Sequence, residues 1–165
     1  MSSSNRGAQP RRSVGFWISA WLPVAFGVGV IAIESTSFMG ADHTTGPLRY
    51  IWEWVFGHFT DNSWEFTHHI IRKSGHFIGY GTLGLLWLRA WWKTREHSPF
   101  LQNALLALLC TALVASADEI HQTFLPNRTG SPWDVLLDSC GALMLMSVTW
   151  LILRIGAPRR LARAA

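Results

Sequence analysis

The sequence predicts an all-α fold, an integral membrane four-helix bundle with a short interfacial amphipathic helix in the first outer loop. Three observations predict this class. Only 15% of the 165 residues are charged, whereas soluble domains carry roughly 25%. The apolar residues form long blocks, and an α-helix needs roughly 20 such residues to cross a bilayer. The basic residues lie mainly on one side of the membrane that these blocks would cross.

Four apolar blocks define the predicted transmembrane helices. Residues 14–33 contain no charge over 20 positions, and residues 100–117 contain none over 18. Residues 70–92 are nearly apolar after a polar start, and residues 135–153 contain one charged residue, Asp138. An alternative for the first block is a cleaved signal peptide. We favour an uncleaved anchor, because the block exceeds the roughly 7–15 residues of a signal-peptide core and no A-x-A site follows it.

The distribution of charge predicts the orientation. Ten of the 14 basic residues fall on one side of the predicted helices. The positive-inside rule therefore places both termini and the loop between the second and third helices in the cytoplasm. The basic balance follows from membrane topology, so no nucleic-acid partner is predicted. The ten residues are Arg6, Arg11, Arg12, Arg89, Lys93, Arg95, Arg154, Arg159, Arg160 and Arg163.

The chain divides into one domain and two tails. Residues 1–13 form a predicted disordered basic tail, residues 14–155 the membrane domain, and residues 156–165 a second basic tail. Within the first outer loop, residues 47–59 place aromatic and aliphatic side chains at helical spacing. This pattern predicts a short amphipathic helix lying in the membrane interface.

A polar stripe lies on the second predicted helix. At 100° per residue its four members fall within about 60° of one another, so they form one face. Gly75 and Gly79 lie on the opposite flank as a small-xxx-small pair, which predicts close approach of another helix there. The four members are His69, Lys73, His76 and Tyr80.

Two further helices carry polar residues to the same end of the bundle. A charge at the bilayer centre costs at least about 2.5–3.5 kcal/mol, so such groups face the interior and pair with one another. Ser131, Pro132 and Asp134 also fit the N-cap, N1 and N3 positions of a pattern like a capping box. The polar residues are Asp118, Glu119 and Gln122 at the end of the third helix, Arg128 in the loop, and Asp134 and Asp138 at the start of the fourth.

These residue types point to two kinds of chemistry. Lys73, Arg128 and a helix N-terminus suit a phosphate or carboxylate group. His76 with Glu119 or Asp118 fits a general acid and base. The alternative is a polar network that only specifies helix packing. A zinc site formed by His76, Glu119 and His121 is a further alternative, but no H-E-x-x-H spacing supports it, and no metal or other cofactor is predicted.

The motifs "KSGHFIGYGTLGLL" and "DEIHQTFLPNRTGSPWDVLLDSCG" resemble the VanZ-like family of membrane proteins, over roughly residues 14–155. That family carries K-x-x-H-x-x-x-Y, then D-E-x-x-Q-x-F, an Arg and D-x-x-x-N-x-x-G. This chain departs from the pattern at Asp138, where the family usually has Asn, and at Leu145, where a second Gly is common. The positions that match are Lys73, His76, Tyr80, Asp118, Glu119, Gln122, Phe124, Arg128, Asp134 and Gly141.

The resemblance implies a multi-pass protein of the bacterial plasma (inner) membrane. The protein for which the family is named is similar to accessory proteins of resistance to glycopeptide antibiotics, notably to teicoplanin. We expect a site that binds or modifies an anionic, lipid-linked envelope molecule at the outer leaflet. The lipid bilayer is the other expected partner. The alternatives are a non-catalytic scaffold or modulator and a proton- or ion-coupled transport component. The expected acid/base residues are His76, Asp118 and Glu119, and the expected substrate-binding residues are Lys73, Tyr80, Gln122, Arg128, Asp134 and Asp138.

Overall fold

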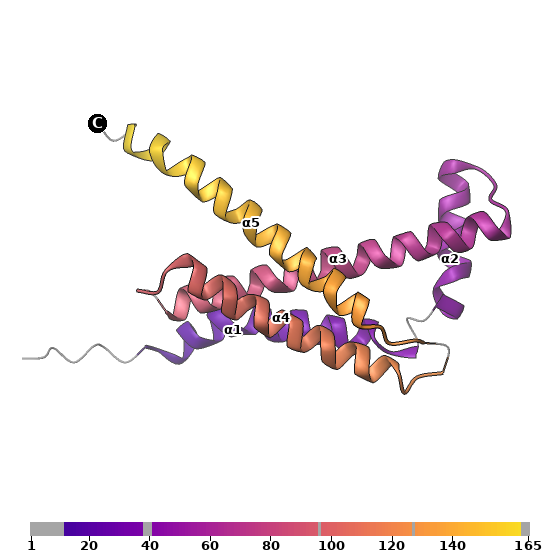
Figure 1. The fold of residues 1–165 in the computed structure, drawn as a ribbon, viewed down its shortest axis with the longest axis horizontal. Helices are drawn as coiled ribbons and strands as arrows, with labels where there is room; N and C mark the ends of the chain where they lie inside the picture. Colours follow the sequence, from indigo (N-terminus) through magenta and orange to yellow (C-terminus); the bar gives the residue numbers. More distant parts are fainter. Residues whose placement is uncertain (1–11, 38–40, 96, 127, 163–165) are drawn as a thin grey trace, which may run out of the picture.

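The computed structural model describes residues 12–37, 41–95, 97–126 and 128–162, and this part of the chain contains helices and turns but no strand (Figure 1). The predicted N-terminal tail lies almost entirely outside the described residues. The last helix continues beyond residue 155, where the membrane domain was expected to end. The helices are α1 (Val14–Glu34), α2 (Ala41–Phe56), α3 (Asp61–Thr94), α4 (Phe100–Gln122) and α5 (Pro132–Ala162).

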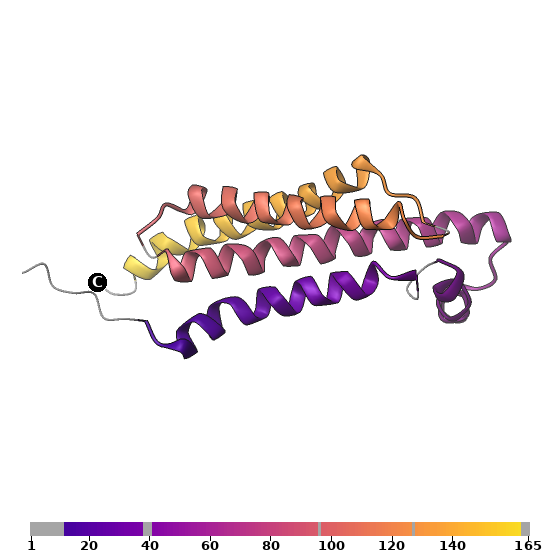
Figure 2. The same cartoon turned by 90° about the horizontal axis from the view of Figure 1, so that it is seen from below.

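Helix α3 is the centre of the arrangement, because it contacts α1, α4 and α5. Figure 2 shows α1 on one side of α3 and α4 with α5 on the other. Figure 1 shows that α5 crosses α3 obliquely, and that α2 lies across the end of the molecule where α3 begins. Through this arrangement the part of α3 from Lys73 to Tyr80 lies near the end of α4 and the start of α5, and we call this the site end.

Three of the described helices are long and apolar enough to cross a membrane. These are α1, α4 and the part of α5 from Pro132 to Gly156. Helix α3 is longer, at 34 residues, but it is not among them. Its polar stripe and its Arg89 dilute the apolar run that the sequence contains. A fourth crossing by α3 therefore stays a prediction.

Helix α4 is polar inside and apolar outside, the reverse of a helix in a soluble protein. Leu101, Leu105, Leu109 and Leu113 recur every fourth residue and are each more than half exposed. Exposing one such side chain to water costs about 1.5–3 kcal/mol, so this face requires an apolar solvent. The arrangement is that of a membrane protein. The buried polar side chains of α4 are Asn103, Thr111, Asp118, Glu119 and Gln122.

Small residues allow α3 and α5 to approach closely, but they are not the glycines that the sequence pattern indicated. A Cβ on Gly141 would lie 2.2 Å from the carbonyl oxygen of Phe77, and one on Gly84 would lie 2.7 Å from the Cβ of Ala142. In contrast, a Cβ on Gly75 or Gly79 would meet nothing within 4 Å. The prediction that this pair mediates helix packing was wrong, because their face borders open space.

Basic side chains join the start of α1 to the end of α3, at the end opposite the site end. Arg89 Nη1 donates to the carbonyl oxygen of Ser19 at 3.0 Å, and Lys93 Nζ donates to Ser19 Oγ at 2.6 Å. Arg12 Nη1 donates to the carbonyl oxygen of Thr94 at 2.8 Å. The basic residues of this end thus lie together as the positive-inside rule requires, while the orientation of the termini in a membrane stays a prediction.

Helix α2 occupies the predicted amphipathic segment, although it begins earlier and ends at Phe56. Gly57 follows with φ 89°, a left-handed conformation that favours glycine and ends the helix. The side chains of Tyr50, Ile51 and Trp54 are largely exposed. This apolar face suits the membrane interface, and that location stays a prediction.

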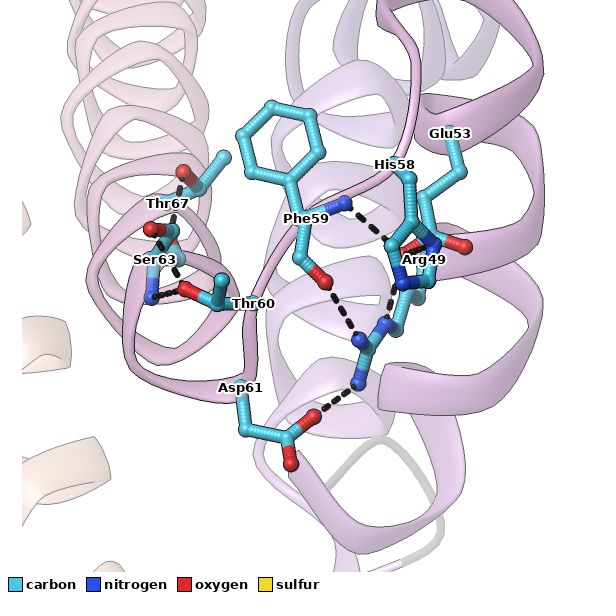
Figure 3. A network of polar contacts seen from close by, with 8 residues as sticks. All are labelled: Arg49, Glu53, His58, Phe59, Thr60, Asp61, Ser63 and Thr67. Atoms are coloured by element: carbon cyan, nitrogen blue, oxygen red, sulfur yellow. Dashed lines mark hydrogen bonds and ion pairs between the residues drawn. The ribbon is translucent and has the colours of Figure 1, made fainter.

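The turn between α2 and α3 is held by Arg49 (Figure 3). Its Nε donates to Glu53 Oε1 at 2.9 Å, its Nη1 to Asp61 Oδ1 at 2.8 Å, and its Nη2 to the carbonyl oxygen of Phe59 at 2.8 Å. The backbone N–H of Phe59 also donates to Glu53 Oε1, at 3.2 Å. Thr60 is the N-cap of α3, and its side chain accepts from the backbone N–H of Ser63.

Acidification should loosen this turn. The pKa of Glu53 lies below its ordinary 4.5, because Arg49 and then the Phe59 N–H donate hydrogen bonds to the carboxylate. A depressed carboxyl pKa stabilises the fold above the unfolded value, and this stabilisation is lost as pH falls through the folded value. We expect the Glu53 carboxyl carbon, followed by NMR, to titrate below 4.5 and to move back towards 4.5 in Arg49→Gln. An identical midpoint in the variant would contradict this account of the turn.

Candidate functional site

The polar stripe of α3 meets acidic residues of α4 and α5. The stripe therefore faces the interior of the helix bundle, because an unpaired charge in the membrane is costly. The three contacts follow one another along α3 away from the site end. They are the ion pair of Lys73 with Asp134, a contact of 3.5 Å between His76 Nδ1 and Asp138 Oδ2, and a hydrogen bond of 2.9 Å from Tyr80 Oη to Asp118 Oδ2.

Tyr80 and Gln122 hold Asp118 between them. Gln122 lies one turn after Asp118 on α4, and its Nε2 donates to Asp118 Oδ2 at 3.1 Å. Tyr80 donates to the same oxygen, and its ring stacks on His76 with centroids 6.0 Å apart. All three residues of this hydrogen-bonded group are buried. Tyr80 and Gln122 therefore fix the position of a carboxylate.

Glu119 accepts a hydrogen bond at the N-terminus of α5, the role that the capping-box pattern assigns to Asp134. Ser131 Oγ accepts from the backbone N–H of Trp133 at 3.2 Å, which makes Ser131 the predicted cap. The N–H of Ser131 itself donates to Glu119 Oε2 at 2.7 Å. Asp134 pairs with Lys73 instead. The cap thus ties the end of α4 to the start of α5.

The α4–α5 loop also passes very close to α4. A Cβ on Gly130 would lie 2.1 Å from the carbonyl oxygen of Glu119. Only glycine leaves room for this backbone contact. The close contact places the neighbouring Ser131 N–H within reach of the Glu119 carboxylate.

Arg128 faces the carboxylates but hydrogen-bonds elsewhere. Its Nη2 donates to the carbonyl oxygens of Glu34 and Thr36, at 3.0 Å each, so it joins the loop to the end of α1. Burial, and then the charge of Arg72, lower the pKa of Arg128, while Asp118 and Glu119 act in the opposite direction. A guanidinium remains charged under such conditions. No ion pair with another described residue neutralises this charge, so Arg128 brings a positive charge to the site.

Three buried carboxylates each keep one oxygen without a hydrogen-bond partner among the described residues. These oxygens are Asp118 Oδ1, Glu119 Oε1 and Asp138 Oδ1. Asp118, Glu119 and Asp138 are 8%, 5% and 0% exposed, respectively. An unsatisfied buried polar atom costs about 1–3 kcal/mol, and more when the group is charged. The site therefore retains unused capacity to accept hydrogen bonds or to bind a cation.

A polar cavity of about 150 Å³ opens beside these contacts. Three cations border it, and the one acidic side chain among its lining residues, Asp134, is paired with Lys73. Among the described residues, no hydrogen bond or ion pair involves Arg72. The cavity is therefore a positively charged opening above a layer of buried acids. Its lining residues are His69, Arg72, Lys73, His76, Gln122, Arg128, Thr129 and Asp134.

An apolar groove of about 440 Å³ lies between α1 and α3. It shares Arg72, His76 and Arg128 with the polar cavity, so the two spaces adjoin. Gly75 and Gly79 line it, which explains why they touch no other helix. Its apolar walls come from Phe26, Val30 and Ile31 of α1 and from Leu83 and Leu86 of α3.

The structure thus gathers the residues that the sequence singled out, with different partners for several of them. Lys73, His76, Gln122, Arg128 and Asp134 border the cavity. Tyr80, Asp118, Glu119 and Asp138 form the buried layer.

The sequence interpretation did not include Arg72 or the Ser35–His121 contact, in which Ser35 Oγ lies 2.9 Å from His121 Nδ1. The sequence feature that could indicate Arg72 as a site residue is its position beside Lys73, at a depth where an unpaired cation is costly. The ring of His121, which the sequence offers as an alternative zinc ligand, contacts the end of α1 instead.

The comparisons with known proteins agree with the motif resemblance. A family model described as VanZ/LLP1 matches residues 18–154, which is most of the chain. Neither a curated protein nor a solved structure matches it. The chain is therefore a membrane protein of the VanZ/LLP1 family.

Proposed function

We propose that this protein binds an anionic, lipid-linked molecule of the cell envelope, with its phosphate or carboxylate group in the polar cavity and its hydrocarbon chain in the α1–α3 groove. The observation that carries the proposal is the continuity of the two spaces through Arg72, His76 and Arg128. A polar opening joined to a lateral apolar groove matches the two parts of an amphiphile. By the positive-inside rule, the site end faces the outer leaflet.

The polar cavity suits the anionic group because its cations are only partly neutralised. Lys73 is paired with Asp134, whereas Arg72 and Arg128 form no ion pair in the described part of the chain. A guanidinium binds phosphate or carboxylate through two parallel N–H donors, which gives both strength and orientation. The first turn of α5 adds the favourable end of a helix dipole nearby.

The apolar groove suits the chain because it faces the lipid. Phe26 is 73% exposed and lines the groove. Gly75 and Gly79 keep the groove open, because a side chain at either position would project into it. A chain lying there would remain in apolar surroundings while its headgroup enters the cavity, so binding would not require lifting the lipid out of the membrane.

Transport is less well supported. Below the buried acids, the core between α3, α4 and α5 is mainly apolar, with Leu88, Ala107, Ala142 and Met146 forming one cluster. Two buried polar residues of α4 also lie there, Asn103 and Thr111, and the Thr111 hydroxyl donates to the carbonyl oxygen of Ala107 in its own helix. A proton or ion relay needs polar groups or water along the whole path. The described residues form a connected polar network at the site end, and Asn103 and Thr111 hydrogen-bond to nearby carbonyl oxygens instead of extending it.

A photo-crosslinking amino acid at Phe26 tests the proposal. We expect it to capture lipids bearing phosphate or carboxylate headgroups in excess of their share of the membrane, as identified by mass spectrometry of the adducts. The matched control is the same amino acid at Leu113, which lies at a comparable depth on α4, is 61% exposed and borders neither space. Equal adduct composition at both positions, with bulk lipid proportions, would refute lipid selection by the groove.

A further inference from the structure

We infer that His76, Glu119 and Asp138 form a binding site for one divalent transition-metal cation, of the class of Zn²⁺. The ligand atoms of these three side chains lie within 4.8 Å of one another. They come from three helices, α3, α4 and α5, and their residues are half-buried or buried. The inference is independent of the proposed lipid binding, because the site lies in the layer of acids beneath the cavity.

Two unpartnered oxygens provide the second, independent observation. Glu119 Oε1 and Asp138 Oδ1 have no hydrogen-bond partner among the described residues, although their residues are only 5% and 0% exposed. Buried polar atoms in folded proteins are nearly always satisfied, and a bound ion is one of the established reasons for an exception. Two of the exceptions among the described residues fall on side chains that can converge on one ion.

The surrounding contacts orient the ligands without blocking them. Ser131 N–H holds Glu119 by Oε2, which leaves Oε1 available. Among the described residues, Asp138 makes one long side-chain contact, with Oδ2 at 3.5 Å from Nδ1 of the other proposed ligand His76. The His76 ring is further held by stacking on Tyr80. Such outer contacts fix the orientation of ligands in known metal sites.

The donor set selects the class of cation. One imidazole nitrogen with two carboxylate oxygens suits Zn²⁺ and its neighbours, whereas Mg²⁺ and Ca²⁺ prefer oxygen ligands alone. Ligands at about 2.0–2.2 Å from one ion lie at most about 4 Å apart, so small inward rotations of these side chains complete the site. Three protein ligands leave one coordination position open in a four-coordinate site.

Metal binding by the full-length protein tests the inference. The protein is purified in detergent through a tag without histidine, stripped with a chelator, and reloaded with Zn²⁺ before desalting. We expect close to one Zn²⁺ per chain by elemental mass spectrometry, unchanged by a tenfold excess of Mg²⁺ or Ca²⁺. Loading with Co²⁺ should produce visible d–d absorption. Wild-type protein that retains no Zn²⁺, or that loses it to Mg²⁺, would overturn the inference.

Variants locate the ion within the chain. Glu119→Gln and Asp138→Asn keep the side-chain volumes but each removes an anionic ligand, so we expect Zn²⁺ affinity to fall at least about a hundredfold. Glu65→Gln is the matched control, since Glu65 is exposed at the start of α3, and it should bind as the wild type does. Full Zn²⁺ retention in both ligand variants would place the ion elsewhere and refute this site. The wild-type Co²⁺ spectrum shows whether the protein binds a transition-metal cation even if a variant fails to fold.

Discussion

Gly141→Ala is expected to separate α3 from α5 and to cost about 3 kcal/mol or more of the free energy of unfolding. The new Cβ would lie 2.2 Å from the carbonyl oxygen and 3.0 Å from the carbonyl carbon of Phe77. Both are backbone atoms of α3, so no side-chain rotation relieves the clash and the helices must move apart. Because His76 and Asp138 flank this crossing, the variant should also disturb the site.

Gly79→Ala provides the control for this prediction. Its Cβ would meet nothing within 4 Å, and alanine favours a helix over glycine by about 1 kcal/mol. We expect the unfolding free energy of this variant to equal or exceed that of the wild type. Reversible denaturant unfolding in mixed micelles, followed by tryptophan fluorescence, measures both variants. Similar losses in the two would show that the α3–α5 approach is not determined by Gly141.

Lys73→Met is expected to destabilise the protein by about 1–3 kcal/mol, because it leaves Asp134 charged and unpaired near the membrane. The side chains of this ion pair are 34% and 21% exposed, so partial hydration keeps the loss below that of a fully buried pair. Asp134→Asn should cost less, since Lys73 can extend its flexible chain into the polar cavity.

The double variant Lys73→Met/Asp134→Asn distinguishes pairing from packing. If the two charges stabilise each other, the double variant should be more stable than the sum of the single losses predicts, by about 0.5–3 kcal/mol. The same unfolding measurement is made on the wild type, the two single variants and the double variant, which together form a double-mutant cycle. Simple additivity would mean that the ion pair contributes nothing, and that Lys73 is held at the cavity for another purpose.

Helical spacing predicted the polar stripe well, because a helix fixes the angular position of each residue. Lys73, His76 and Tyr80 do face one side, and each contacts an acidic residue of α4 or α5. Long apolar runs likewise predicted three of the described helices to be membrane-spanning in length and apolarity. Both properties are local to a single helix, so the sequence of that helix contains them.

The partners of these residues could not be read from the sequence, since they depend on how helices are placed relative to one another. Gly75 and Gly79 have the spacing of a packing motif, yet they line the groove. Gly141 has no such partner glycine at that spacing, yet it meets Phe77. Glu119 reaches the N–H of Ser131 from another helix, a contact that replaces the local capping box.

Lipid capture at Phe26 in the Arg72→Gln variant tests whether the cavity holds an anionic headgroup. Arg72 borders the cavity and has no partner in the described part of the chain. Its removal should therefore lower the yield of anionic adducts about tenfold or more, the loss expected for one charge-assisted contact. Arg89→Gln, at the other end of α3, should leave the yield unchanged. Undiminished anionic adducts in Arg72→Gln would contradict the account.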